Sequence, residues 1–427
     1  MINLKTLFAA ACCAVSATVG AVVPSDSILM MANNYYAYPV NDSNAPKLTD
    51  TPKGYVPYHI EHYGRHGSRW LIGQDVYSKA IDMLIPAERN GKLTPRGKQL
   101  MEQLRALNKG YDYGNRDGEL TQVGADQHRG IARRMYANFP QIFADDARVD
   151  ARSTIVIRCI LSMDNELQEL KAANPKLRIT SDASAADMYY MNFHDSVPNP
   201  AKPIASKLQK QFAKSHPVGD EYLSKIISDP KFAADSIDSD KLFEQLFRIV
   251  INYQSHNKGE FTDYYDIFSE KEIKQKWQHR NVDWYLRYGN TKLTNNSMPY
   301  NQRNLLRNII QSADTAIVYG KNSANLRFGH DTIVLPLAVL MELDNYGAEY
   351  TDLEQIADNW RAYEVIPMAG NIQMIFYRPA NKKATADNTL VKVLLNEHEV
   401  KLPIATKNAP YYSWAQLRDY YLAKINK

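Results

Sequence analysis

The chain has 427 residues, of which 44% are hydrophobic and 23% are charged, and its formal net charge is +4. This length can bury a large core and suits two domains, or one domain with a long insertion. The mildly basic charge favours small anionic partners and is too weak to predict a nucleic-acid partner. No internal repeat at the period of a solenoid is present, so a repeat protein is excluded.

Residues 1–21 have the pattern of a secretory signal peptide. A short apolar core, residues 7–15, is followed by small residues that permit cleavage after Ala17 or Ala21. This apolar run is shorter than the roughly 20 residues that a membrane-spanning helix needs. We therefore expect an exported protein, periplasmic or secreted, without a stable membrane span. A lipid anchor on one of the two signal cysteines is the alternative.

The cysteine content limits how an exported form of this protein could be stabilised. Once the signal is removed, Cys159 is the only cysteine, so no disulfide can form within the chain. An exported protein of this size can do without one, because its core is large enough. Cys159 follows Arg158 and could act as a nucleophile, but a packed thiol is the simpler interpretation.

The stretch Tyr-Gly-Arg-His-Gly-Ser-Arg, residues 63–69, follows a predicted strand, residues 56–63. It places Arg65, His66 and Arg69 in one short turn. Guanidiniums suit a phosphate-like anion, because their planar donors match its oxygens and they stay charged. A neutral imidazole can attack phosphorus, and histidine is a recognised covalent catalyst. The turn therefore predicts an anion site with a candidate nucleophile.

A second unit of the same kind follows. Residues 147–154 predict a strand that runs into a helix beginning near Thr154, and this helix carries Arg158 in about its first turn. Anions favour that position, because free N–H groups and the helix dipole point at them. Arg158 is therefore a second candidate for anion binding.

A third unit lies near the carboxyl end of the chain. Residues 325–329 predict a strand, and His330 and Asp331 come directly after it. The apolar residues 333–341 predict a deeply buried helix. That helix has to begin close to Asp331, because Pro336 fits only near the first turn.

Other segments complete an α/β pattern. Helical spacing is found at residues 80–89, 95–107, 204–212, 241–253, 304–311 and 411–421, and strands are predicted at 372–377 and 390–395. Thr94 and Thr121 are well placed as helix N-caps. Alternating strands and helices without a dinucleotide fingerprint predict a sheet with helices on both faces. Ligands of such sheets bind at the carboxyl edge of the strands.

The central region, from about residue 165 to 300, has a different character. Strand alternation largely disappears there, and polar helical sequence predicts an inserted, mostly helical region. We interpret its basic side chains as solvated surface charges; they include Lys207, Lys210, Lys276, Arg280 and Arg287.

Several motifs occur together in one order. They are Arg-His-Gly-Ser-Arg at 65–69, Leu-Thr with Gly124 and Gln127 at 120–127, Arg-Ser-Thr at 152–154 with Arg158, and Phe-Gly-His-Asp-Thr at 328–332. Segments 366–376 and 391–396 add to the likeness. This set resembles the histidine phosphatase superfamily, in the branch of the histidine acid phosphatases. That branch includes phytases and multiple inositol polyphosphate phosphatases.

The resemblance implies a fold and a domain division. The core would be a three-layer α/β/α domain with a mostly parallel central sheet, formed by residues 22–165 and 301–427. Residues 166–300 would form a mainly helical cap inserted into it, which in this family covers the pocket and sets specificity.

The resemblance also implies roles for individual residues. His66 matches the nucleophile that becomes phosphohistidine, and Asp331 matches the acid that protonates the leaving alcohol. The phosphate-binding residues would be Arg65, Arg69, Arg158 and His330. Cationic donors stabilise charge on the transferring phosphoryl group, and no cofactor is required.

A metal site is the competing interpretation of the histidines at 59, 62 and 66. In a strand His59 and His62 point to opposite faces, so they would not ligate one ion together. No HExxH pattern or carboxylate cluster completes a site, and neighbouring arginines repel a cation. We therefore expect no metal, and we interpret His59 and His62 as hydrogen-bonded structural residues.

The expected partner is a small-molecule phosphate ester. Phytate or another inositol polyphosphate, a sugar phosphate and a nucleotide all stay open, as does the oligomeric state. The inositol polyphosphate branch often has His-Ala-Glu where this chain has His330-Asp331-Thr332, so its donor resembles that of bacterial acid phosphatases and phytases. Trp70 could line the pocket or pack beneath it.

The alternative to an enzyme is a non-catalytic periplasmic binder of phosphorylated ligands.

Overall fold

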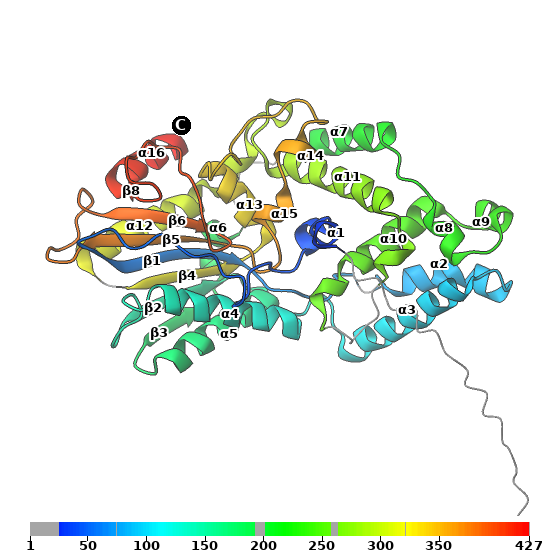
Figure 1. The fold of residues 1–427 in the computed structure, drawn as a ribbon, viewed down its shortest axis with the longest axis horizontal. Helices are drawn as coiled ribbons and strands as arrows, with labels where there is room; N and C mark the ends of the chain where they lie inside the picture. The colour runs from blue at the N-terminus through cyan, green and yellow to red at the C-terminus, as the bar shows by residue number, and fades with distance from the viewer. Residues whose placement is uncertain (1–24, 74, 193–200, 258–263, 321, 427) are drawn as a thin grey trace, which may run out of the picture.

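The computed structural model describes residues 25–73, 75–192, 201–257, 264–320 and 322–426, so the expected signal peptide lies outside it. A β-sheet with helices on both faces forms one part of the molecule. A group of helices forms the other part, beside the edge of that sheet (Figure 1).

The strands form one mixed sheet. They are β1 (Tyr55–Arg65), β2 (Arg148–Ser153), β3 (Arg178–Asp182), β4 (Ala324–Gly329), β5 (Asn371–Pro379), β6 (Leu390–Leu395), β7 (His398–Glu399) and β8 (Tyr412–Ser413). Their order is β3-β2-β4-β1-β5-β6-β7, and β8 pairs with β6. Strands β3, β2, β4 and β1 are parallel, whereas all pairs beyond β1 are antiparallel.

The α/β class is confirmed, but the sheet is mixed where we expected it to be mostly parallel. The parallel strands are joined through helices, as parallel neighbours require. In contrast, β5 and β6 follow each other with no helix between them, which is the connection of an antiparallel hairpin.

Helices cover both faces of the sheet (Figure 1). On one face, α4 (Gln122–Asn138) and α5 (Ile157–Ala173) enclose a core with β2 and β4. On the other, α12 (Arg303–Tyr319), α13 (Asp331–Leu340) and α16 (Trp414–Ile425) enclose a second core. These are the three layers that the sequence predicted.

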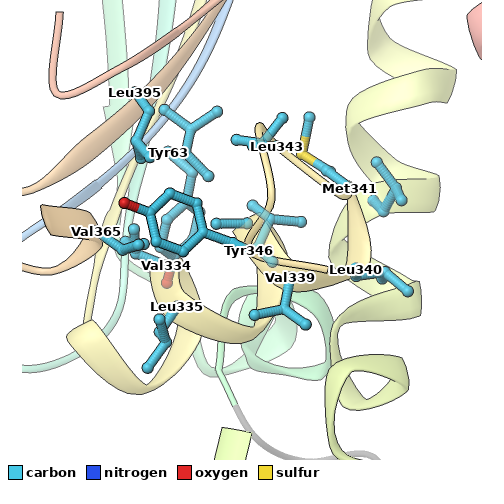
Figure 2. Close-up of a cluster of buried hydrophobic side chains, with 14 of the residues drawn as sticks. Tyr63, Val334, Leu335, Val339, Leu340, Met341, Leu343, Tyr346, Val365 and Leu395 are labelled. Carbon is cyan, nitrogen blue, oxygen red and sulfur yellow. The ribbon is translucent and has the colours of Figure 1, made fainter. Parts of the chain in front are cut away.

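Helix α13 is apolar on all sides and lies inside the second core (Figure 2). Val334, Leu335 and Val339 lie among Tyr63 of β1 and side chains that follow the helix. The helix begins at Asp331 as predicted. Pro336 is its sixth residue and lies beyond the first turn, so the carbonyl of Thr332 has no intrahelical donor at that position.

The second part of the molecule is helical, and it contains more than the predicted insertion. Its core joins α2 (Ser78–Arg89) and α3 (Pro95–Gly114) to α8 (Tyr222–Ile226) and α10 (Ser239–Ile251). Helix α9 (Pro230–Ser236) joins the same core, and α11 (Glu270–Tyr288) contributes to it and to the core around α13. Helices α6 (Met188–Met191), α7 (Ala201–Ser215), α14 (Ile356–Asn359) and α15 (Ala362–Val365) contribute to the core around α13. Short 3₁₀ turns are η2 (Ala185–Asp187), η3 (Tyr253–Ser255), η4 (Tyr265–Ile267), η5 (Lys292–Thr294) and η6 (Met298–Gln302).

The predicted domain boundaries differ from these placements in two ways. The boundary between residues 165 and 166 falls inside α5, and β3 beyond it belongs to the sheet. Helices α2 and α3, which we assigned to the core, pack with the inserted helices. Helical periodicity shows that a helix has an apolar face, but it does not show which partner covers that face.

The N-terminal segment lies between the two parts. It contains α1 (Asp26–Met30) and η1 (Asn33–Tyr35), and α1 lies between the sheet and the helical part (Figure 1). Asn33, Asn34 and Tyr35 are all buried. Within the part of the chain that the structure describes, no helix is long and apolar enough to cross a membrane.

Candidate active site

The carboxyl ends of three parallel strands meet at one edge of the sheet. Phe328 of β4 lies in register with Gly64 of β1 on one side and with Ser153 of β2 on the other. The residues that follow these strands are therefore neighbours. The backbone N–H of His66 donates to the carbonyl of Gly329 at 2.9 Å. This is the edge at which the sequence predicted a site.

Helix α4 holds the turn at 65–69 from behind. A Cβ on Gly67 would lie 2.4 Å from the carbonyl oxygen of Gly124, so the two backbones touch. Gln127 accepts from the N–H of Ser68 at 2.9 Å and donates to its hydroxyl at 3.0 Å. Thr121 caps the helix by accepting from the N–H of Gly124, and its own N–H donates to the Ser68 carbonyl. The motif at residues 120–127 therefore fixes the shape of the turn at residues 65–69.

His66 is buried and neutral. Its Nδ1 lies 2.9 Å from the carbonyl oxygen of Gly67, which can only accept, so Nδ1 carries the proton and Nε2 keeps its lone pair. Burial, and then the positive charges of Arg65, Arg158 and Arg69, hold the pKa of His66 well below its ordinary value of 6.5. The imidazole thus has the form that a nucleophile needs.

Arg65 is fully buried and connects three segments. One of its amino groups forms an ion pair with Asp331 at 2.8 Å. The other donates to the backbone carbonyls of Asn34 at 2.5 Å and Ile366 at 2.8 Å. The Asn34 side chain also donates to Asp331, at 3.0 Å.

Asp331 is an ionised carboxylate in the free protein. Burial raises its pKa, but the charge of Arg65 and the hydrogen bond from Asn34 lower it further than burial raises it. One carboxylate oxygen accepts from Asn34 and forms the ion pair with Arg65, and the other accepts from the N–H of Thr332 at 2.8 Å. The side chain is therefore held from both sides.

His330 completes this edge of the sheet. Its ring lies 5.9 Å from that of His66, measured between centroids, and its Nε2 lies 3.2 Å from the hydroxyl of Thr154. Burial and the nearby charge of Arg158 lower the pKa of His330 to about 4.

Burial also raises the pKa of Cys159 to about 11, so this residue is a packed thiol and not a thiolate nucleophile.

A pocket of about 390 Å³ opens beside Asp331. Arg69 and Arg280 line it, and their guanidiniums lie 5.4 Å and 5.6 Å from the centre of the Tyr35 ring. Arg287 lines it too, together with Asp283, with which it pairs at 2.8 Å. Three arginines and two aspartates, Asp283 and Asp331, therefore line this pocket.

Other residues singled out in the sequence have structural surroundings. Arg152 pairs with Asp150 and Asp182 at the outer part of the sheet. Trp70 packs in the helical core against Tyr77 and His256, and it is not among the residues lining the pocket beside Asp331.

The two candidate metal-binding histidines lie on opposite faces of β1, as predicted. His59 contacts Glu61 at 2.9 Å, whereas neither ring nitrogen of His62 has a hydrogen-bond partner. The prediction of a hydrogen-bonded residue is thus right for His59 and wrong for His62. Among the described residues, no group of three His, Cys, Asp or Glu side chains could hold a metal ion.

Sequence reasoning missed three residues of this site. Asn34 and Tyr35 lie in a segment without periodic pattern, so nothing in the sequence signalled that it returns to the sheet edge. Arg280 was interpreted as a solvated charge, but it lines the pocket and donates to Asn34 at 2.9 Å. Lys276 and Arg287 are also partly buried, while Lys207 and Lys210 are exposed as expected.

Known proteins share this arrangement of elements. The chain matches the histidine phosphatase superfamily (branch 2) over residues 98–396, which includes Arg158, His330 and Asp331 but begins after His66. It is 23% identical to multiple inositol polyphosphate phosphatase 1 of Homo sapiens over 338 residues. That match covers 71% of this chain and 66% of the human protein, just under two thirds of its length.

Solved structures with the same fold include those of two further proteins. Multiple inositol polyphosphate phosphatase of Bifidobacterium longum, in complex with phosphate, superposes with a TM-score of 0.74 at 19% identity. This covers 93% of this chain and 98% of that one. The phytase from D. castellii gives a TM-score of 0.69 at 15% identity, covering 93% and 85% of the two chains. These likenesses show the fold.

The family match extends over well more than half of the sequence. The chain therefore belongs to the histidine phosphatase superfamily, branch 2, the branch of the histidine acid phosphatases.

The close contact between the turn and α4 gives a first prediction. Gly124→Ala would bring a Cβ to 2.2 Å from the Ser68 carbonyl, so the turn or the helix must shift. We expect at least about a tenfold loss of activity in protein that still folds, because catalysis is sensitive to displacements of about 1 Å.

Gly110→Ala is the matched control for Gly124→Ala. Gly110 lies in α3, and the nearest atom to a new Cβ is on Trp70 at 3.7 Å, an ordinary contact. We expect unchanged activity, and stability that rises by about 0.5–1 kcal/mol in urea unfolding. Full activity of Gly124→Ala would show that the contact does not shape the turn.

The electrostatics of His66 give a second prediction. Arg158→Met removes one of the charges that depress the pKa of His66, so this pKa should rise toward 6.5. The neutral fraction of His66 should then be lost at a higher pH than in the wild type. Histidine-selective NMR titration measures this directly. Arg152→Met is the control and should leave His66 unchanged, and an unchanged His66 in both variants would remove Arg158 from the site.

Proposed function

We propose that this protein is an exported phosphomonoesterase that transfers a phosphoryl group from a phosphate ester to His66 and then to water. The observation that carries this proposal is the state of His66. Its Nδ1–H is held by the Gly67 carbonyl, and its Nε2 lone pair is free of a proton among three arginines. Family membership supports the same assignment.

In the first step the phosphoryl group lies among Arg65, Arg69, Arg158 and His330. Their N–H groups stabilise the charge that develops on its oxygens. Nε2 of His66 forms a bond to phosphorus while the bond from phosphorus to the ester oxygen breaks. Asp331 gives its proton to that oxygen, which leaves as an alcohol.

The second step returns the enzyme to its starting state. The Asp331 carboxylate takes a proton from water, and the water oxygen attacks phosphorus. The bond between phosphorus and Nε2 breaks, inorganic phosphate leaves, and His66 is neutral again. No metal ion and no cofactor takes part in either step.

Asp331 has to be protonated for the first step, although it is ionised in the free protein. A bound phosphate group brings negative charge next to Arg65 and Asp331. Like charge raises the pKa of a carboxyl group, so the donor gains its proton in the complex. Mildly acidic conditions favour this state, which suits an acid phosphatase.

The pocket supports a substrate with several phosphate groups. Arg69, Arg280 and Arg287 line the cavity beside Asp331, and Lys276 lines an adjoining cavity of about 270 Å³. One phosphate group does not need so many cations. We therefore propose an inositol polyphosphate such as phytate. The structures with the same fold include the Bifidobacterium longum protein in complex with inositol hexasulfate, at a TM-score of 0.73 and 18% identity.

Export is supported by the sequence of residues 1–21, with their apolar core and small residues. Amino-terminal sequencing of the protein recovered outside the cytoplasm tests it. The mature chain should begin at residue 18 or 22, and an intact residue 1 would contradict cleavage.

A leaving-group experiment tests the mechanism. Asp331→Asn should slow hydrolysis of an alkyl phosphate by about 10²–10⁴-fold, because an alkoxide needs a proton to leave. Transfer of the phosphoryl group from nitrophenyl phosphate to His66 should slow less than about tenfold, because nitrophenolate leaves without a proton. Rapid-quench kinetics of leaving-group release in the first turnover measures this step for both esters, apart from the second step, in which Asp331 also acts. Equal losses would remove Asp331 from the donor role.

The same experiment includes two histidine variants. His66→Ala should abolish hydrolysis of both esters, and His398→Ala, at an exposed position on β7, should abolish neither. Substantial activity of His66→Ala would contradict the nucleophile assignment.

A substrate comparison tests the polyphosphate proposal. We expect kcat/KM for inositol hexakisphosphate to exceed that for glucose 6-phosphate or AMP by at least about tenfold, or about 1.4 kcal/mol. Arg287→Met should lower only the first value, and Lys207→Met, on an exposed part of α7, should change neither. Equal or higher values for the monophosphates would favour a broad acid phosphatase instead.

A further inference from the structure

Asn34 has contacts that the mechanism above does not use. It belongs to η1, far from the sheet in sequence, yet its side chain is buried at the sheet edge. Its amide nitrogen donates to Asp331 at 3.0 Å, and its amide oxygen accepts from Arg280 of α11 at 2.9 Å. Its backbone carbonyl accepts from Arg65 at 2.5 Å. Asn34 thus contacts the predicted proton donor Asp331, the predicted phosphate-binding residue Arg65, and Arg280 of the helical cap.

These contacts fix the orientation of the amide. A guanidinium can only donate, so Arg280 selects the oxygen of the Asn34 side chain as its partner. The amide nitrogen then lies on the side of Asp331, to which it donates. A carboxylate accepts such a hydrogen bond more strongly than a protonated carboxyl group does, so the bond favours the charged form. The arrangement therefore favours the ionised form of Asp331 and one rotamer of its side chain.

We propose that Asn34 is a positioning residue for Asp331, oriented in turn by Arg280 of the cap. This inference rests on the proposed function, in which Asp331 is the proton donor. Asn34 acts through Asp331 and does not touch the reacting atoms. It aims the carboxyl group at the leaving oxygen and sets the pH at which the group holds its proton.

Several other charged and titratable groups face Asp331. Arg65 of β1, Arg69 of the following turn, Arg158 of α5 and Arg280 of α11 are positive, and His330 is adjacent; Tyr63, Cys159 and Tyr288 are neutral. The positive groups lower the pKa of Asp331 together with Asn34. Removal of Asn34 alone leaves all of these charges in place, so its effect can be measured separately.

Asn34→Ala keeps the backbone carbonyl that holds Arg65 and removes only the amide. The carboxylate loses a donor, so its pKa rises. The donor is active when protonated, and kcat falls as pH rises through its pKa. The alkaline limb of the pH profile of kcat should therefore move to higher pH by about one unit. The rate of the first step, measured in a single turnover, should also fall about tenfold at the optimum for an alkyl phosphate and change little for nitrophenyl phosphate.

Asn34→Asp sharpens the test. It keeps an acceptor for Arg280 but places a second carboxyl group against Asp331. Two carboxyl groups in one site share a proton, and the pair titrates with a raised apparent pKa. The alkaline limb should move further up than in Asn34→Ala.

Gln254→Ala is the matched control. Gln254 fixes the same N-terminal segment by accepting from the N–H of Ala37 at 3.1 Å and donating to the Leu29 carbonyl at 3.0 Å. Its loss loosens the segment but leaves the Asn34 amide in place. The alkaline limb should stay where it is in the wild type. An equal shift in Gln254→Ala would show that the segment matters and the amide does not, which would overturn the proposal.

A second measurement does not depend on activity. The ¹³C signal of the Asp331 carboxyl group, assigned by its loss in Asp331→Asn, should stay at its ionised position in the free wild type at about pH 4. In Asn34→Ala it should move toward the protonated position. An unmoved signal in this variant overturns the positioning role. If the wild-type protein hydrolyses no phosphate ester but the signal still moves in Asn34→Ala, the proposed function is contradicted and the contact is not.

Discussion

The buried guanidinium of Arg65 is the constraint on which this site depends. A charge without solvent is costly unless it is paired and hydrogen-bonded. Arg65 meets that requirement with partners from three segments that are far apart in sequence. These are Asp331 at the start of α13, Asn34 in the N-terminal segment and Ile366 before β5. The site can form only when all three have reached the same edge of the sheet.

The same requirement explains the position of the N-terminal segment. A surface segment would leave the donors of Arg65 and the carboxylate of Asp331 with fewer partners. Because Asn34 lies between them, the segment is held in the junction of the sheet and the helical part (Figure 1). Its amide also reaches Arg280 of α11, so the cap and the catalytic edge are connected by one residue.

The clamp of arginines has a second consequence, which concerns His66. Burial lowers the pKa of His66 most, and the charges proposed to hold a phosphoryl group lower it further. In the proposed mechanism the same arginines therefore bind the phosphoryl group and help to keep the nucleophile unprotonated. A bound phosphate neutralises part of this charge, which favours the proton on Asp331 at the moment when it is needed.

The sequence predicted the parts of the site that depend on local patterns. The turn at 65–69, Arg158 and the pair at 330–331 each follow a strand, and parallel strands bring their carboxyl ends to one edge. It did not predict Asn34, Tyr35 or the burial of Arg280, because these depend on how a segment without periodicity packs. Nor did it predict that α2 and α3 pack with the inserted helices, because an apolar helix face does not show which element covers it. The mixed sheet arose from the hairpin of β5 and β6, which strand patterns alone do not distinguish from a parallel pair.

The central claim is that His66 carries the phosphoryl group between the two steps. It is tested by mixing the protein with a ³²P-labelled phosphate ester, stopping the reaction with alkaline denaturant within milliseconds, and locating the label by peptide mass spectrometry. We predict a phosphorylated peptide that contains His66 and is absent from His66→Ala. Rapid turnover with no labelled protein, or a label on another residue, would contradict the account.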